Sequence, residues 1–597
     1  MIERRKQMTR DKVSRLINWG HWFAFFNGLL AMIIGSRYIS SVGQPDSLIS
    51  WGYLALSTMS HFTFLAFIVY VLFIFPISLL LPYSKILRGY AAFIASMGLY
   101  ILLYDTIIYD DYGIHLSPFA FDLAWQDLNA LLHSTSYIIT PLAIIIIELT
   151  AANFIWKRID KIQKKQWGNK VVLFVGICFV SSHLVHIWAD AANVTDITRF
   201  DDAYPVSYPA TARSFMENHG VESQAIINKT AAHKTSNLNY PIVPLECKAE
   251  KAQPNILVLT IDGLRADMVD NVTMPFLNQY SDESLKFTQH HSGGTQFSSS
   301  MFTLMYGLQG NYSDKKDFDV IAPVINQELT RQGYQLGLFT GRTATEIASM
   351  GAMFDGFTPT ISESLDGTAT NDIQSIAAFN QWQETQTTPW FSILNLSAPQ
   401  DYDTPVGFLG IETVKAPKTL KPAQKVLFNQ YRQSLKFIDN QLSELLPNLP
   451  ENTMVLITGT HGQVFTSDIE DARRDLSPNN VKVPLIIHWS QMANGQINYR
   501  TSHYGIAPTI LSKILGCTTA SEQYSSGRSL LEPNSESWIY IGNSREFAIY
   551  QQDEITVLSR YGKYRIYNLN FDKRLDKKMS APELIQVMRE GRRLYQN

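Results

Sequence analysis

The chain has 597 residues, a formal net charge of −3 at pH 7, and 46% apolar residues. This length exceeds what one hydrophobic core supports, so two or more domains are expected. Because there is neither a basic domain nor a known binding motif, nucleic acid is excluded as an expected partner.

The first 190 residues differ in composition from the rest. Residues 1–190 are dense in Ile, Leu, Phe, Tyr and Trp, whereas residues 191–597 have the composition of a soluble protein. Five apolar segments of about 20 residues, long enough to span a bilayer, are predicted at 18–36, 57–81, 86–108, 134–156 and 170–190. No small-residue cleavage site follows the first segment, so it is interpreted as an uncleaved helix.

The charges of the connecting loops predict how the spans are oriented. The N-terminus and the loops near residues 82–88 and 157–170 are basic, whereas the loop at 106–133 has no Lys or Arg. The basic loops are expected in the cytoplasm. An odd number of spans then places residues 191–597 outside, in the periplasm of a bacterium.

Two acidic residues fall within or near the spans. Asp105 lies close to a predicted helix end, where it is expected to reach the lipid headgroups. Glu148 is either functional, as intramembrane acids are by default, or lies near a helix end and reaches the headgroups. The sequence leaves open whether Glu148 is functional.

A polar linker at residues 191–250 follows the last span. Within it, Pro209 can open a helix, and Arg213 adds positive charge close to the expected membrane surface. Free backbone N–H groups at a helix start bind anions, so a lipid phosphate is a candidate ligand. The alternative is an ordinary amphipathic connector helix.

The remaining residues, 251–597, alternate predicted strands and helices around a mostly parallel sheet. Strands are predicted at 255–261, 333–340, 390–396, 453–459 and 483–489, a helix at 428–446, and short antiparallel strands near 555–569. Asp262 follows the first strand, at the sheet edge where such folds place ligands. Asp262 is therefore either a metal or substrate residue, or a turn residue that caps the next helix.

The chain has three cysteines. Cys178 lies inside an apolar run and is expected to be a buried small hydrophobe. A disulfide between Cys247 and Cys517 is possible if that part of the chain is extracytoplasmic, but sequence alone cannot place the two in contact.

The order of motifs resembles that of the alkaline phosphatase/sulfatase superfamily. The motifs are Asp262-Gly-Leu-Arg, Gly293-Gly-Thr295, Thr458-Gly-Thr-His-Gly462, Val483-Pro-Leu-Ile-Ile-His488 and His503-Tyr-Gly-Ile-Ala-Pro-Thr509. Residues 14–27, 34–38, 186–190, 207–213 and 332–339 resemble the YejM/PbgA inner-membrane proteins of Gram-negative bacteria more closely. The resemblance implies a five-helix transmembrane domain (1–190), a periplasmic linker (191–250) and a sulfatase-like α/β domain (251–597).

The resemblance also implies a degraded catalytic site. Asp262 matches the first metal ligand, and His461 and His503 match later ligands, so one divalent ion (Mg, Mn or Zn) is the most this set implies. Thr295 is a vestigial nucleophile candidate, because Gln296 stands at the nucleophile position. Thr460 replaces an expected Asp. With so few carboxylates, non-catalytic use is favoured over hydrolysis.

The YejM/PbgA resemblance implies a lipid-sensing regulator of lipopolysaccharide synthesis that acts with a LapB-type adaptor. Its lipid-contact segment corresponds here to Thr211, Ala212, Arg213, Ser214 and Phe215, with Ser214 where a second Arg is expected. Lipopolysaccharide (through its lipid A) or cardiolipin is the implied ligand. The alternatives are cardiolipin transport and a metal-dependent phosphatase or phosphoryl or phosphoethanolamine transferase acting on envelope lipids.

Overall fold

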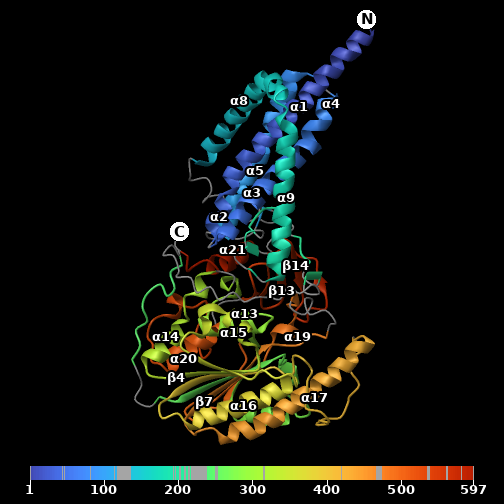
Figure 1. Ribbon diagram of the computed structural model, residues 1–597. Coiled ribbons are helices and arrows are strands. Elements are labelled where there is room, and N and C mark those ends of the chain that lie inside the picture. The colour runs from blue at the N-terminus through green and yellow to red at the C-terminus, as the bar shows by residue number, and fades with distance from the viewer. Residues whose placement is uncertain are drawn as a thin grey trace. The chain divides into compact units, whose positions relative to one another are not determined.

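The computed structural model (Figure 1) describes residues 2–42, 45, 47–80, 83–112, 115–116, 136–192, 194, 197–198, 200, 203–207, 210–212, 215–216, 238–248, 253–313, 316–418, 420–465, 474–533, 538–559, 562–579 and 581–595. The chain forms two compact units, residues 1–226 and 227–597. We call the first the membrane unit and the second the sulfatase-like unit, after the motifs that each carries.

The membrane unit contains five helices that are long and apolar enough to cross a membrane, among the described residues. They cover Lys12–Ile39, Leu48–Leu80, Ser84–Asp110, Ile139–Lys164 and Trp167–Ala191. All five predicted spans are thus confirmed. The helices extend past the predicted apolar segments, because helical hydrogen bonding continues beyond the stretch that matches the bilayer.

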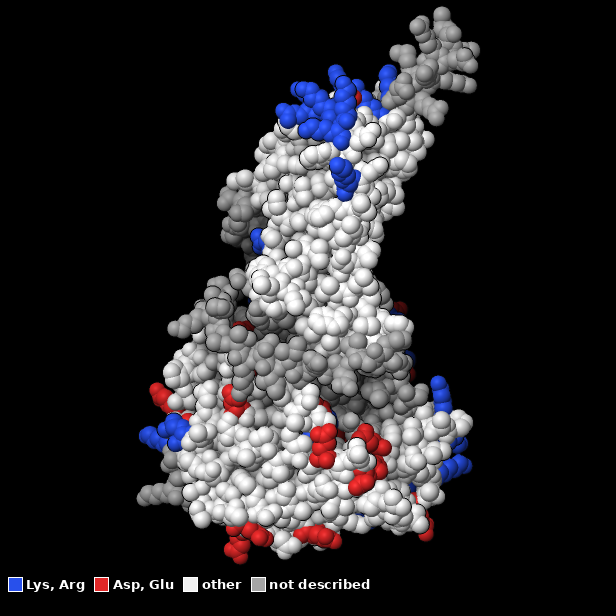
Figure 2. Space-filling model, in the orientation of Figure 1, with Lys and Arg blue, Asp and Glu red and all other residues white. Residues whose placement is uncertain are grey.

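The spans are built from the helices α1 (Ile2–Gly35), α2 (Arg37–Val42), α3 (Leu48–Val69), α4 (Phe75–Leu80), α5 (Ser84–Tyr112), α8 (Ser136–Lys164) and α9 (Trp167–Ala191). A π-helical turn, Tyr70–Ile74, joins α3 to α4. Helix α1 approaches α3 closely at Gly28, where an added Cβ would lie 2.9 Å from the Thr63 Cα. Small residues at such contacts let helix backbones pack tightly in lipid. Figure 2 shows the sides of this unit almost free of charge, with Lys and Arg gathered at one end.

Both acids in the spans are buried. Asp105 is 4% exposed and accepts hydrogen bonds from the Tyr38 hydroxyl and the Leu116 backbone N–H; His115 Nδ1 lies 2.8 Å from its Oδ2. The expectation that Asp105 reaches the headgroups is therefore wrong. Glu148 faces the bundle interior with 0% exposure, and Asn27 Nδ2 donates to its Oε2 at 3.2 Å.

The second unit is organised by an eight-stranded sheet in the order β5-β4-β6-β1-β7-β8-β2-β9. Its strands are β1 (Asn255–Asp262), β2 (Leu285–Phe287), β4 (Gln335–Thr340), β5 (Thr358–Ile361), β6 (Trp390–Leu396), β7 (Thr453–His461), β8 (Leu485–His488) and β9 (Gly495–Ile497). Pairing is parallel except where β8 meets β7 and β2. The mostly parallel sheet is thus confirmed.

Strand β1 lies between β6 and β7, at the centre of the unit. Its side chains alternate between two cores, as strand geometry requires. Ile256 and Val258 pack with α13 (Phe297–Tyr306), α14 (Val324–Arg331) and α20 (Ile506–Lys513). Leu257 and Leu259 pack on the opposite face with α12 (Pro275–Asp282), α16 (Thr368–Glu384) and α17 (Pro422–Leu445). Figure 1 shows α13, α14 and α20 on one face of the sheet and α16 and α17 on the other. Helical cover on both faces explains the continuous apolar run of the strand.

The remaining elements complete this unit. A five-stranded antiparallel sheet follows the main one: β11 (Ile539–Gly542), β12 (Glu546–Tyr550), β13 (Ile555–Ser559), β14 (Tyr564–Tyr567) and β15 (Arg574–Leu575). Strands β3 (His290–His291) and β10 (Thr501–Ser502) form a parallel pair. The other helices are α15 (Ala344–Ala348), α19 (Pro478–Val481) and α21 (Ala581–Glu590).

A disulfide joins Cys247 to Cys517, which confirms the pairing left open by the sequence. It closes a loop of 270 residues and so ties the start of this unit to the segment after α20. Cys178 is 2% exposed within its span, as expected for a buried small hydrophobe.

Breaking the disulfide is expected to destabilise the sulfatase-like unit. A loop this long restricts the unfolded chain strongly, so Cys517→Ser should lower the free energy of unfolding by about 5 kcal/mol. Denaturant unfolding of the full chain, followed by fluorescence with and without reductant, measures the effect. Cys178→Ala is the matched control and should leave this transition unchanged. Equal stability of the oxidised and reduced wild-type chain would contradict the expectation.

Candidate functional site

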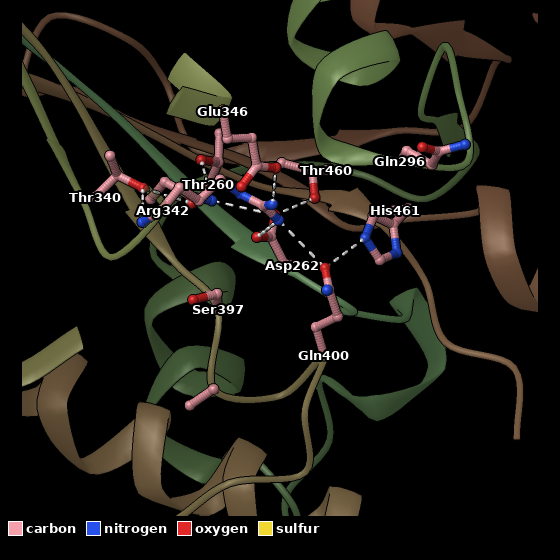
Figure 3. A network of polar contacts seen from close by, with 12 residues as sticks. Thr260, Asp262, Gln296, Thr340, Arg342, Glu346, Ser397, Gln400, Thr460 and His461 are labelled. Carbon is pink, nitrogen blue, oxygen red and sulfur yellow. Dashed lines mark hydrogen bonds and ion pairs between the residues drawn. The ribbon is translucent and has the colours of Figure 1, made fainter. Parts of the chain in front are cut away.

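Asp262 lies at the carboxyl end of β1 and is completely buried. Asn395 Nδ2, on β6, donates to its Oδ1 at 3.1 Å, and Thr460 Oγ1, on β7, donates to the same oxygen at 2.5 Å. Arg342 Nη2 pairs with Oδ2 at 2.5 Å. Figure 3 shows Thr460 and Arg342 beside the carboxylate. Since each comes from a strand or the loop after one, the parallel sheet itself assembles the group.

Arg342 follows β4 and supplies the positive charge of this group. Its guanidinium also pairs with Glu346, one helical turn along α15, and lies over the Phe297 ring at 4.2 Å. Burial acts to lower the pKa of Arg342, but the charges of Asp262 and Glu346 outweigh it and raise that pKa. Arg342 is therefore a fixed cation in this site.

His461 and Gln400 extend the network from Arg342. Gln400 Oε1 accepts from Arg342 Nη2 at 3.3 Å, and His461 Nε2 lies 3.3 Å from the same oxygen. His461 Nδ1 lies 2.7 Å from the Gly462 carbonyl oxygen. Burial lowers the pKa of His461, so the neutral imidazole is favoured.

His503 belongs to a different group of buried side chains. Its Nε2 lies 3.3 Å from Thr458 Oγ1, and its ring centroid is 5.2 Å from that of His290. Thus Asp262 and His461 share one network, while His503 bonds within another. Among the described residues, the one group of three close metal-ligand types is Cys247, Glu328 and Cys517, and its two cysteines form the disulfide.

The predicted metal ligands Asp262, His461 and His503 do not form one close group among the described residues. Both Asp262 oxygens already accept hydrogen bonds, and one of them is paired with the Arg342 guanidinium. A second positive charge there would be repelled at close range. The residues around Asp262 do not fit a divalent ion, and we derive no chemistry through one.

The nucleophile candidates precede α13. Thr295 is half-buried, and Gln296 is the N-cap residue of that helix. Figure 3 shows Gln296 apart from the bonded group around Asp262. A buried carboxylate paired with a guanidinium stabilises structure, but it does not lower the pKa of a hydroxyl for attack.

Sequence reasoning missed Arg342, Asn395 and Gln400. A signal existed for two of them: Arg342 follows a predicted strand, and Asn395 is a lone amide in the apolar run at 390–396. Side chains at the carboxyl ends of neighbouring parallel strands meet at one sheet edge.

The predicted lipid segment begins beside the last span. His186 Nδ1, within Trp167–Ala191, lies 3.0 Å from the Ala210 carbonyl oxygen. Thr211 and Ala212 are non-helical, and the Phe215 side chain is 60% exposed. The Met216 N–H donates to the Ala212 carbonyl at 3.0 Å. Arg213 and Ser214 lie outside the described residues.

Comparison with known proteins covers nearly the whole chain. It is 30% identical over 609 residues to the inner membrane protein YejM of Salmonella typhi, spanning 99% of both chains. The chain belongs to the YejM family of inner membrane proteins. An uncharacterized protein of Haemophilus influenzae is 28% identical over 575 residues, covering 94% of this chain and 93% of that one.

Two family models match different parts of this YejM-family chain. Residues 6–247 match a domain of unknown function, DUF3413, and residues 254–516 match the sulfatase family. Among solved structures, an alkaline phosphatase superfamily protein from Vibrio parahaemolyticus is 14% identical with a TM-score of 0.46, covering 62% of this chain and 95% of its own. The lipoteichoic acid synthase LtaP from Listeria monocytogenes is 15% identical with a TM-score of 0.43, covering 58% and 94%.

Removing only one charge of the buried pair is expected to be costly. Arg342→Gln leaves the Asp262 carboxylate buried without a counter-charge, so the free energy of unfolding should fall by about 3–5 kcal/mol. Denaturant unfolding of the full chain measures the loss. The double variant Asp262→Asn with Arg342→Gln should recover most of it, because both charges are gone.

An exposed ion pair serves as the control for this experiment. Lys286 pairs with Asp282 at 3.7 Å on the surface, so Lys286→Gln should cost less than about 1 kcal/mol. If Arg342→Gln costs no more than Lys286→Gln, the pair does not hold the site together.

The buried histidines predict a stability that falls with acid. Burial lowers the pKa of both His503 and His291 to about 3, from an ordinary 6.5. Below pH 6.5 the unfolded chain binds protons that these folded imidazoles do not, so stability decreases as pH falls from 6.5 toward 3. When the pH is lowered from about 7 to 5, the free energy of unfolding of His503→Gln should fall by about 2 kcal/mol less than that of the wild type. Denaturant unfolding at each pH measures the difference. An unchanged pH dependence would show that His503 is protonated when folded.

Proposed function

We propose that this protein is a lipid-sensing regulator of lipopolysaccharide synthesis and outer-membrane homeostasis. It binds an anionic membrane lipid, lipid A or cardiolipin, through the juxtamembrane segment at residues 211–215. It passes the lipid signal to a LapB-type adaptor in the membrane. The observation that carries the proposal is the hydrogen-bond contact between Ala210 and His186, which fixes the start of this segment to a membrane span.

Position and chemistry together favour a lipid ligand. His186 is five residues before the end of α9, so the segment starts within about 8 Å of that helix end. Arg213 supplies a cation for a lipid phosphate, and the exposed Phe215, two residues later in the sequence, supplies an apolar surface. An amphipathic lipid presents both chemistries at the membrane interface.

Two observations support a periplasmic position for the segment and the sulfatase-like unit. Disulfides such as Cys247–Cys517 persist in oxidising compartments, which include the bacterial periplasm. The opposite side of the spans carries Lys161 and Lys164 in the last turn of α8, as expected of a cytoplasmic loop.

A metal-dependent phosphatase or transferase is the competing function. Such chemistry needs an Asp262 carboxylate free for a cation and an activated hydroxyl. The Arg342 guanidinium on that carboxylate favours a structural use of the site instead.

Lipid mass spectrometry of the purified full chain tests the proposal. Arg213→Ala should reduce co-purified anionic lipid severalfold, since it removes the charge-assisted contact to phosphate. Lys425→Ala, an exposed cation on α17, is the matched control and should retain wild-type lipid. The paired neutral variant Asp262→Asn with Arg342→Gln should also retain it.

The outcomes separate the hypotheses. Selective loss of lipid A or of cardiolipin in Arg213→Ala identifies which lipid is bound. Unchanged lipid content in Arg213→Ala would contradict the proposal. Turnover of a phosphate ester that depends on divalent metal and is abolished by Asp262→Asn would favour the enzyme.

A further inference from the structure

Residues 203–207 form a turn that makes hydrogen-bond contacts with side chains of a membrane span. The Tyr204 hydroxyl lies 2.5 Å from Thr58 Oγ1, and His61 Nε2 lies 3.0 Å from the Pro205 carbonyl oxygen. The Tyr204 ring also stacks on the His61 ring, with centroids 5.4 Å apart. Thr58 and His61 both belong to the span Leu48–Leu80.

The depth of these partners can be derived from helix length. The span has 33 residues, which is about 50 Å of helix against a hydrocarbon core of about 30 Å. A centred helix then projects about 10 Å at each end. Thr58 and His61 lie about 15 and 20 Å from Leu48, which is about 5–10 Å inside the hydrocarbon boundary for a centred helix. They are also among the first five residues of the apolar segment 57–81, where the hydrocarbon begins. The turn hydrogen-bonded to them therefore lies at or just inside that boundary, where the upper acyl chains begin.

Val206 is the outward-facing residue of this turn. Its side chain is 79% exposed, whereas Ala203 and Tyr204 are 1% and 2% exposed. Its backbone has a φ of +57°, a conformation that β-branched residues strongly avoid. Such conformations persist where the surrounding structure imposes them, and they cluster at ligand-binding sites. Here the Tyr204 and His61 contacts hold the two residues before Val206, and the Val206 side chain is directed away from the protein.

We propose that the turn at residues 204–207 is an acyl-chain contact site, in which Val206 packs against lipid in the leaflet beside the juxtamembrane segment. Val206 precedes Thr211 by five residues, so one lipid can place its phosphate at 211–215 and its upper acyl chain at Val206. The position of the lipid phosphate at 211–215 rests on the proposed function. The depth of Val206 in the membrane does not rest on it. Non-helical backbone at this depth is tolerated where its polar atoms are bonded. Here His61 contacts the Pro205 carbonyl, and the Ser207 N–H donates to the Tyr204 carbonyl at 3.3 Å.

Fluorescence quenching of the full chain in phosphatidylcholine nanodiscs tests the depth. Val206→Cys, made in a Cys178→Ala background, takes a bimane label because the other two cysteines form the disulfide. Leu173→Cys, at a residue 65% exposed within the last span, is the lipid reference. Leu365→Cys, at a fully exposed residue of the sulfatase-like unit, is the water reference.

The inference predicts that lipids brominated on the upper acyl chain quench the label at Val206 at least half as strongly as at Leu173. Iodide in the buffer should quench it much less than at Leu365. Quenching at Val206 that matches Leu365 for both quenchers would overturn the inference. Since these nanodiscs contain no anionic lipid, this result is independent of the Arg213→Ala experiment.

A second variant separates a lipid contact from a strained structural turn. Val206→Gly relieves the positive φ and removes the apolar side chain, so lipid retention should fall severalfold while thermal stability is kept or raised. Gln166→Gly, at another positive φ of +49° between α8 and α9, is the matched control and should retain lipid. Raised stability with unchanged lipid in Val206→Gly would leave only a structural turn and overturn the inference.

Discussion

The ion pair between Asp262 and Arg342 is the interaction that fixes the arrangement of the buried site in the sulfatase-like unit. A carboxylate with no solvent exposure at the end of a central strand requires a counter-charge, because an unpaired buried ion is strongly destabilising. In the superfamily that the motifs resemble, metal ions bind at this position. Here the guanidinium of Arg342, 80 residues further along the chain, pairs with Asp262 Oδ2. Asn395 and Thr460 donate hydrogen bonds to the other carboxylate oxygen, Oδ1. The fold of that superfamily is retained, and its central carboxylate is paired with a guanidinium.

Patterns that are local in sequence predicted the fold well. The apolar run before Asp262 indicated a strand covered on both faces, and five apolar segments indicated five spans. Long-range pairing was not predictable in the same way. Arg342 follows a predicted strand, which indicates its sheet edge, but the strand order that brings it to Asp262 cannot be taken from the local sequence. The position of Asp105 near a helix end indicates its depth but not the direction of its side chain. His115, ten residues later, together with Tyr38 on another helix, turns Asp105 inward.

Polar residues within the spans have a shared role in the membrane unit. Thr58 and His61 hold the turn at Tyr204, and His186 holds Ala210, so span residues fix both sides of the segment that leads to the proposed lipid site. Each of these contacts is short and partly or fully buried, conditions under which a hydrogen bond restricts geometry most. A lipid that moves this segment would therefore act directly on the helices that carry Thr58 and His186.

Anomalous diffraction from crystals of the protein soaked in saturating manganese or zinc tests the central claim most directly. The account predicts that the Arg342 guanidinium remains within hydrogen-bond distance of Asp262, with no anomalous peak at coordination distance from that carboxylate. Two well-coordinated cations beside Asp262 and a neighbouring hydroxyl, with Arg342 displaced, would contradict it.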